Sequence, residues 1–201
     1  RSLRGLGWFN APTVELSGVN LWAPPGRWAE PDALHQEQLL DRRAWLVPDY
    51  PPYSGSLAPE APPADAMILP WLAYRYDLDG LWLEHAADVA SAPDGSALVY
   101  PGTRWGLVDR PVPSVRLKRL RRGLQDYELA RLLQRAGREL LARRIAGQLV
   151  RYGLTDACRE NLLSCLPTGW SPEPDAPELA RTLLRQELVN VFTPSDAGQA
   201  Q

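Results

Sequence analysis

The sequence is poor in the side chains that most often bind metals or act as nucleophile partners. Among its 201 residues it has two histidines, two cysteines and one methionine. His35 and His85 lie in separate segments, and no G-x-S-x-G elbow, Walker-type loop or dinucleotide fingerprint is present. The sequence therefore predicts no metal site, no cofactor and no serine triad. His85 follows Glu84, but a single histidine at the end of a strand is typical of a hydrogen-bonded structural residue.

Cys158 and Cys165 are seven residues apart in a segment that we predict to be helical from Thr155 onward. On one helix they would share a face but lie roughly 10 Å apart along the axis, which is too far for a disulfide. Their spacing is also too wide for a pair of zinc ligands. We expect two small buried residues.

Long apolar runs are absent as well. No stretch of 18 apolar residues exists, and the first ten residues lack the apolar core of a signal peptide, so we expect no membrane partner. The composition, 45% hydrophobic and 23% charged with net charge −2, is typical of a soluble globular protein. The chain begins at Arg1 and has its only methionine at Met67, which favours a processed product or part of a longer protein and predicts no localisation.

Proline is abundant but unevenly placed. Fifteen of the twenty prolines lie at or before Pro113 and five at or after Pro167, so residues 114–166 have none. This interval is therefore expected to be the helical part of the chain, whereas the earlier part combines loops with short strands.

The first part of the chain alternates between strand and helix patterns. Strands are predicted at 18–22, 44–47 and 80–83, and helices at 31–42 and 65–76, the second of them bent at Pro70. Such alternation is typical of parallel strands with crossover helices. The sequence thus predicts an α/β fold with about three βα units.

From Ser114 apolar residues recur every three or four positions, as in an amphipathic helix. We expect a break at Gly137, an end at Gly153, and a last helix that begins with a capping box of Asp175 and Glu178 and ends near Phe192. The predicted division is a partial domain over 1–152, a helical extension over 153–192 and a flexible tail over 193–201.

The helical region is rich in arginine, but its basic residues are distributed around the helix without interleaved aromatics. The whole chain is also slightly acidic. These features favour a solvated or ion-paired helix and exclude nucleic acid as the expected partner.

Aromatic residues gather where the predicted strands end. The carboxyl ends of parallel strands carry the ligand site in α/β folds, and flat aromatic faces stack on sugar rings while carboxylates hold the hydroxyl groups. The alternative role for each ring is to pack a loop onto the end of the fold. As a group they predict a carbohydrate pocket; the four are Trp22, Tyr50, Tyr53 and Trp82.

Five strings between roughly 14 and 137 form a recognisable pattern. In chain order they are VNLWAPP, AWLVPDYPPY, LPWLAYRYDLDGLWLEH, GSALVYPG and SVRLKRLRRGLQDYELARLL, and the last is the most specific. Together they resemble the C-terminal part of the glycoside hydrolase family 123-like catalytic domain, also known as domain-of-unknown-function family 4091. From the third string onward the matching residues are Trp71, Tyr74, Asp79, Gly80, Asp94, Gly95, Tyr100, Pro101, Gly102, Ser114, Arg116, Arg121, Gly123, Asp126, Tyr127 and Glu128.

This resemblance implies a (β/α)8 barrel, of which the three predicted strands would be the last. It also implies removal of terminal N-acetylgalactosamine, with the substrate's acetamido group as nucleophile and an adjacent Asp-Glu pair as the catalytic residues. No Asp-Glu dipeptide occurs in the chain, so no catalytic residue is carried over and the chain alone is expected to be inactive. The sequence departs from the family pattern at Asn20, Glu84, Lys118 and Arg122.

We expect the helix motif to be scaffold, with Arg116 and Arg121 paired to carboxylates, Asp126 accepting hydrogen bonds and Tyr127 covering the core. Asn20 and Glu84 then join the aromatics as candidate ligand-binding residues. Two functions remain open at this point. One is the C-terminal part of a glycoside hydrolase that forms one wall of a sugar pocket and needs the rest of the barrel as its partner. The other is a non-catalytic half-barrel that binds a glycan or a protein.

Overall fold

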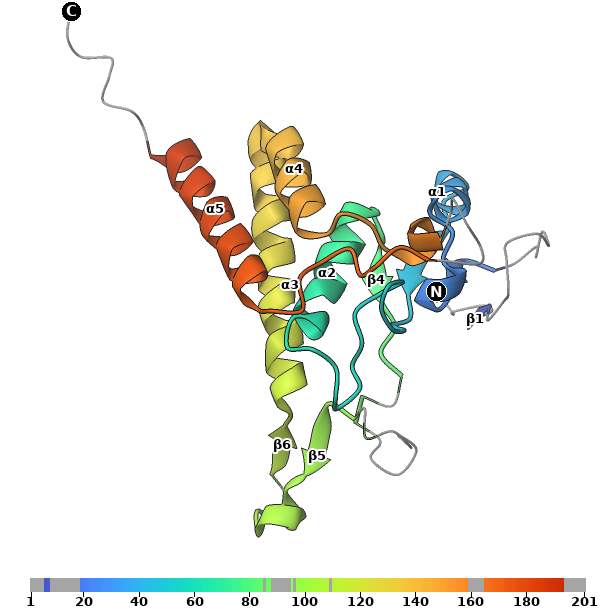
Figure 1. Ribbon diagram of the computed structural model, residues 1–201, viewed down its shortest axis with the longest axis vertical. Helices are drawn as coiled ribbons and strands as arrows, with labels where there is room; N and C mark the ends of the chain where they lie inside the picture. Colours follow the sequence, from blue (N-terminus) through green and yellow to red (C-terminus); the bar gives the residue numbers. More distant parts are fainter. Residues whose placement is uncertain are drawn as a thin grey trace, which may run out of the picture.

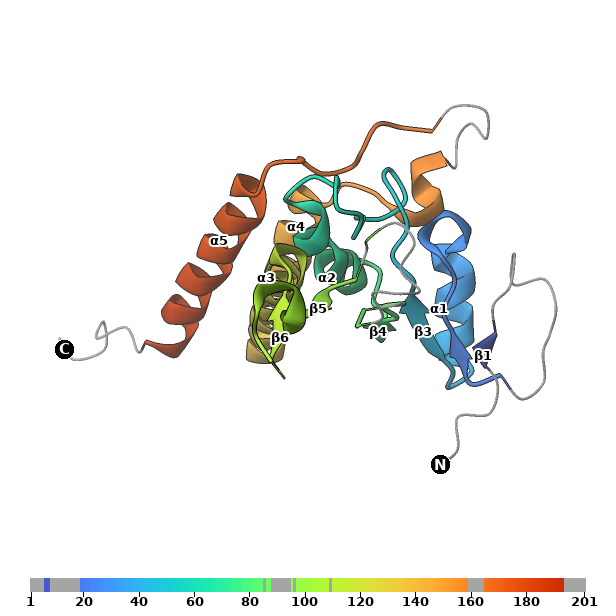
Figure 2. The same ribbon diagram turned by 90° about the horizontal axis from the view of Figure 1, so that it is seen from below.

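The computed structural model describes residues 6–7, 19–84, 86–87, 95, 97–108, 110–158 and 165–193. Over these ranges the chain forms a small parallel sheet beside a layer of helices (Figures 1 and 2). The mixed α/β prediction is confirmed. No helix within them is both long and apolar enough to cross a membrane.

The sheet has four parallel strands in the order of the sequence, and three of them are the predicted ones. The strands are β1 (Leu6–Gly7), β2 (Leu21–Trp22), β3 (Arg43–Leu46) and β4 (Gly80–Leu81). Strand β1 was not predicted. Helix α1 (Pro31–Leu39) connects β2 to β3, and α2 (Asp65–Arg75) connects β3 to β4, as the alternating pattern predicts.

After β4 the chain forms a hairpin and then three long helices. The hairpin pairs β5 (Val99–Pro101) with β6 (Pro111–Pro113) in antiparallel register, and the short helix η2 (Gly102–Trp105) follows β5. The long helices are α3 (Val115–Leu133), α4 (Glu139–Leu149) and α5 (Asp175–Phe192). Ser114 caps α3, because its hydroxyl accepts a hydrogen bond from the Leu117 amide at 3.1 Å.

The predicted break at Gly137 is confirmed. Its φ of 79° lies in the left-handed region that favours glycine, and it interrupts the π-helical turn η3 (Gln134–Arg138) between α3 and α4. Helix α4 then turns back beside the end of α3 (Figure 1).

Helix α2 is the centre of the packing. Its residues from Asp65 to Tyr74 are all buried, including Pro70, because the sheet and α1 lie on one side and α3 and α4 on the other. The Asp65 carboxylate accepts hydrogen bonds from the Ser56 amide at 3.0 Å and the Trp170 indole at 3.1 Å. Burial raises the pKa of Asp65, and these two hydrogen bonds act in the opposite direction.

The cysteine prediction is wrong. Residues Leu154–Cys158 form the short 3-10 helix η4, and Cys158 is joined to Cys165 by a disulfide with a Cα–Cα distance of 4.2 Å. The roughly 10 Å expected between the two cysteines applies only to an unbroken helix. Here Cys165 lies outside any helix. The middle of the predicted helix, 159–164, lies outside the described residues, as does most of the predicted tail.

The expected capping box at α5 does not form either. Pro174 occupies the N-cap position of α5 and makes no side-chain hydrogen bond there. The Glu178 carboxylate pairs with Arg122 of α3 instead. At the other boundary, α4 ends at Leu149 and not at Gly153. The segment after it packs on the first part of the chain: the Leu154 amide donates to the Tyr53 carbonyl, and the Thr155 amide to the Ala29 carbonyl.

The crossing of α2 and α3 depends on a glycine, which leads to a stability prediction. A Cβ atom on Gly123 would lie 2.3 Å from the Met67 carbonyl oxygen, so the two backbones would have to separate. We expect Gly123→Ala to lower the free energy of unfolding by about 1–3 kcal/mol in urea denaturation.

Gly147→Ala in α4 is the matched control. The Cβ atom there meets only the end of the Arg75 side chain, at 3.0 Å, and alanine favours a helix interior. This variant should be as stable as the wild type or slightly more stable. Equal destabilisation by both substitutions would contradict the prediction that the close approach of α3 to α2 at Gly123 is needed for stability.

Candidate functional site

The carboxyl ends of the parallel strands meet at one edge of the sheet, and the candidate residues relate to this edge in different ways. Tyr50 and Tyr53 lie in the loop after β3, and Trp82 and Glu84 follow β4. Asn20 is exposed but precedes β2, so it lies at the beginning of a strand. His85 lies outside the described residues.

Trp22 is a packing residue. Only 5% of it is exposed, and it belongs to a core cluster with Leu34 of α1 and Leu46 of β3. Register explains this position, because Trp22 is the parallel partner of Ala44 and both residues face α1. Trp22 therefore points into the core on the helix-covered face of the sheet.

Trp82 lies on the opposite face with a partner that the sequence analysis did not single out. Its ring centroid is 6.2 Å from that of Trp45, with a tilt of 41°. A Cβ atom on Gly80 would lie 2.9 Å from the Trp45 indole, so glycine there allows the ring to lie over β4. The period of two in AWLV, with Ala44 and Leu46 buried, is the signal that places Trp45 on this face.

A second group, which we call the tyrosine platform, consists of the aromatic residues Tyr50 and Tyr53 together with Arg27. The two rings are in edge-to-face contact at 5.6 Å, Tyr50 is 48% exposed, and the Arg27 guanidinium lies 5.7 Å from the Tyr50 centroid. Asp49 fixes Arg27, since its carboxylate pairs with the guanidinium and accepts from the Arg27 amide, both at 3.0 Å. Arg27 and Asp49 were missed because neither carries a motif.

The disulfide adjoins this platform, because the Tyr53 hydroxyl lies 3.4 Å from Cys165 Sγ. The loop after β3 is thus connected to the C-terminal part of the chain. Glu84, by contrast, is exposed, three residues beyond the end of β4.

Arg116 holds the hairpin: within the described residues its hydrogen bonds go to carbonyl groups and a hydroxyl, where the sequence predicted a carboxylate. Its guanidinium donates to the carbonyls of Leu57, Gly95 and Ala97, and to the Tyr100 hydroxyl at 2.6 Å. The Tyr100 hydroxyl in turn donates to the Gly95 carbonyl at 3.0 Å. Buried carbonyls need donors, and one arginine supplies several of them.

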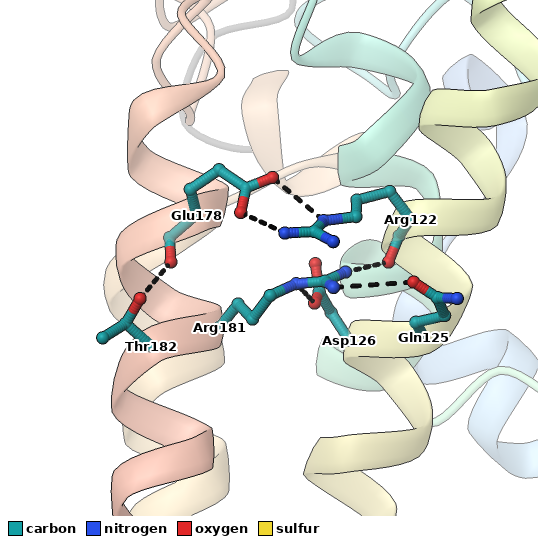
Figure 3. A network of polar contacts seen from close by, with 6 residues as sticks. All are labelled: Arg122, Gln125, Asp126, Glu178, Arg181 and Thr182. Atoms are coloured by element: carbon teal, nitrogen blue, oxygen red, sulfur yellow. Dashed lines mark hydrogen bonds and ion pairs between the residues drawn. The ribbon is translucent and has the colours of Figure 1, made fainter.

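Asp126 and Arg181 form the buried ion pair between α3 and α5, at 2.5 Å (Figure 3). Arg181 also donates to the Arg122 carbonyl at 2.6 Å, and Arg122 pairs with Glu178. Burial raises the pKa of Asp126 to about 6, although Arg181 acts in the opposite direction.

A raised carboxyl pKa is a common mark of catalytic acids, but Asp126 is fully buried between two helices. It is therefore scaffold, in agreement with the prediction that it accepts arginine hydrogen bonds. Tyr127 beside it contacts Tyr74 edge-to-face at 5.9 Å, which agrees with a role in covering the core.

A cleft of about 250 Å³ runs between α2, β4 and α3. Its lining is mostly apolar, with Pro70, Leu81, Leu83, Leu120 and Leu124 among the contributing residues. Its polar groups include Asp79, whose carboxylate accepts from the Ala44 amide at 2.9 Å and from Gln38 at 3.1 Å. Asp79 thus connects β3, β4 and α1. In the described part of the chain, no cluster of three or more potential metal-binding side chains is found.

Comparison with known proteins finds a similarity among solved structures. No protein-family model and no curated protein matches the sequence. Among solved structures, the fold is similar to that of a family 123 glycoside hydrolase from Clostridium perfringens, analysed for the details of glycolipid glycan hydrolysis, with a TM-score of 0.52 and 14% sequence identity. The similarity covers 86% of this chain and 32% of that chain. The chain therefore shares its fold with part of that enzyme and spans about a third of the enzyme's length.

The ion pair gives a prediction with a defined sign. Folding raises the Asp126 pKa from 3.8 to about 6, so the folded state holds a proton that the unfolded state releases in this window. The contribution of Asp126 to stability is therefore lost as the pH rises from about 4 to 6. Asp126→Asn should become more stable relative to the wild type over the same rise, by up to about 3 kcal/mol, in urea unfolding at several pH values.

Glu178→Gln serves as the control of opposite sign. Arg122 lowers the pKa of Glu178, so this carboxylate stabilises the wild type at neutral pH and ceases to do so in acid. The Gln variant should lose relative stability as the pH rises. If Asp126→Asn and the wild type had the same pH dependence, Asp126 would not titrate differently in the folded state.

Proposed function

We propose that this chain is the C-terminal part of a glycoside hydrolase-like (β/α)8 barrel and forms one wall of its sugar pocket. The fold similarity to the family 123 enzyme supports the first half of this proposal. The sheet supports it too, because its strands are parallel and follow one another in sequence order, with α1 and α2 as crossovers.

The observation that carries the sugar wall is the position of Trp82. It follows β4 directly, on the face away from the α1 core, and Trp45 supports its ring. An indole held in this way offers a flat apolar face to a pyranose ring, and Glu84, two residues on, provides a carboxylate for its hydroxyl groups. The tyrosine platform after β3 would extend the same wall.

The proposed substrate class is a terminal N-acetylgalactosaminide, on the strength of the sequence resemblance. The reaction would need an Asp-Glu pair from elsewhere, since this sequence has no such dipeptide. The proposed partner is therefore the remainder of the barrel, which would pair with the outer edges of β1 and β4 to close it. The same absence favours a second candidate, a non-catalytic module that binds a glycan through this wall.

Binding tests the wall directly. We expect Trp82→Ala and Glu84→Gln each to weaken the affinity for N-acetylgalactosamine about tenfold in calorimetric titration, because each removes a stacking face or a charged hydrogen-bond acceptor. Phe192→Ala and Glu173→Gln, exposed residues of the C-terminal region, are the matched controls and should bind as the wild type does. Unchanged affinity in both wall variants would remove the assignment.

Turnover separates the wall from the active site. The 201-residue chain should release no chromophore from a nitrophenyl N-acetylgalactosaminide, because no catalytic pair is present to orient the acetamido group and protonate the leaving oxygen. The same assay with a complete family 123 enzyme is the positive control. Measurable turnover that Glu84→Gln abolishes would show that the chain carries its own catalytic acid.

A further inference from the structure

The hairpin of β5 and β6 extends away from the body of the molecule (Figure 1). Its hairpin tip, which we define as Trp105, Leu107 and Val108, places three large apolar side chains in water within four residues. Trp105 is 56% and Val108 74% exposed. Such a concentration of exposed apolar surface marks an interaction site more often than isolated exposed residues do.

The tip is held firmly in place. Trp105 contacts Tyr100 edge-to-face at 6.3 Å, and the Tyr100 hydroxyl is bound to Arg116. At the base of the hairpin the Ser114 amide donates to the Leu98 carbonyl at 2.8 Å. The apolar side chains are therefore presented in a fixed arrangement, and little ordering is needed for them to bind.

The segment around the tip is strongly basic. Residues 100–121 include six arginines and lysines and one aspartate, although the whole chain has a net charge of −2. Arg110, Lys118 and Arg121 are exposed, on the hairpin and on the first two turns of α3. A partner that covers the tip would meet this positive charge and is therefore expected to be anionic.

We propose that the hairpin tip binds the surface of an anionic lipid bilayer. Trp105 has the amphipathic ring that favours the interface, Leu107 and Val108 supply aliphatic groups for the acyl boundary, and the exposed cations on the hairpin and on α3 would attract the anionic headgroups. A projecting apolar tip fits a deformable surface and needs no complementary groove. The contact is peripheral and involves no spanning segment. It departs from the expectation of no membrane partner, which rests on the absence of a long apolar run and of a signal peptide. It is independent of the proposed sugar wall, because none of its residues belongs to that wall.

Cosedimentation with vesicles tests this proposal on the whole chain. We expect binding to vesicles of phosphatidylcholine mixed with phosphatidylserine, weaker binding to phosphatidylcholine alone, and a decrease in binding with added salt. Val108→Asp should weaken binding to the mixed vesicles about tenfold, because it places a carboxylate in the apolar contact and against the lipid charge.

Leu140→Asp is the matched control, since Leu140 in α4 is 85% exposed and lies in a different element. It makes the same change of charge, also at an exposed aliphatic residue, and should bind as the wild type does. Absence of vesicle binding by the wild type, or equal binding by Val108→Asp, would overturn the proposal. So would equal losses in the two variants, which would indicate a charge effect without a contact.

Sedimentation velocity distinguishes a protein partner of the same chain. If the tip joined two copies, the wild type would associate with increasing concentration, Val108→Asp would not, and neither would bind vesicles. That outcome would also overturn the lipid proposal. Sugar affinity in Val108→Asp should equal that of the wild type, which keeps this test separate from that of the sugar wall.

Discussion

The close approach of α3 to α2 at Gly123 is the contact on which the remaining arrangement depends. The α3 backbone lies against the Met67 carbonyl there, and no side chain other than hydrogen fits between them. With α3 so close, α2 is enclosed on every side, and the sheet and the later helices share one interior. An all-round apolar helix such as α2 is stable in water only when enclosed in this way. The ion pair of Asp126 and Arg181 then fixes α5 on the outer side of α3.

The sequence predicted the long elements well and the short contacts poorly. Proline spacing and apolar periodicity located α1, α2 and the helices after Ser114, because these signals extend over many residues. Strand β6 reads Pro-Val-Pro and β1 has two residues, so neither offers an alternating pattern. Strand register also determines which face of the sheet each tryptophan occupies. Trp22 and Trp45 look alike in the sequence, yet Trp22 enters the core and Trp45 lies on the opposite face.

Most of the motif residues that resemble family 123 have structural tasks in this fold. Ser114 caps α3, Arg116 and Tyr100 hold the hairpin, and Gly123 permits the helix crossing. Similarity at such positions indicates a shared fold and says little about chemistry, because the same scaffold supports different sites. Of the candidate ligand contacts, Asn20 and Glu84 lie where the sequence departs from the family pattern. The residues that resemble the family therefore support the shared fold and do not support a shared chemistry.

The strand-end residues and the hairpin are connected through the backbone. Ala86, two residues beyond Glu84, accepts hydrogen bonds from the amides of Leu98 and Val99 at 2.7 and 3.0 Å, so the base of the hairpin is joined to the end of β4. A sugar wall at Trp82 and a lipid contact at the tip would therefore lie at the same end of the sheet. The two differ in what they require. The wall becomes a pocket only when further strands face it, whereas the tip is complete within this chain, and lipid binding is thus expected even where no sugar is bound.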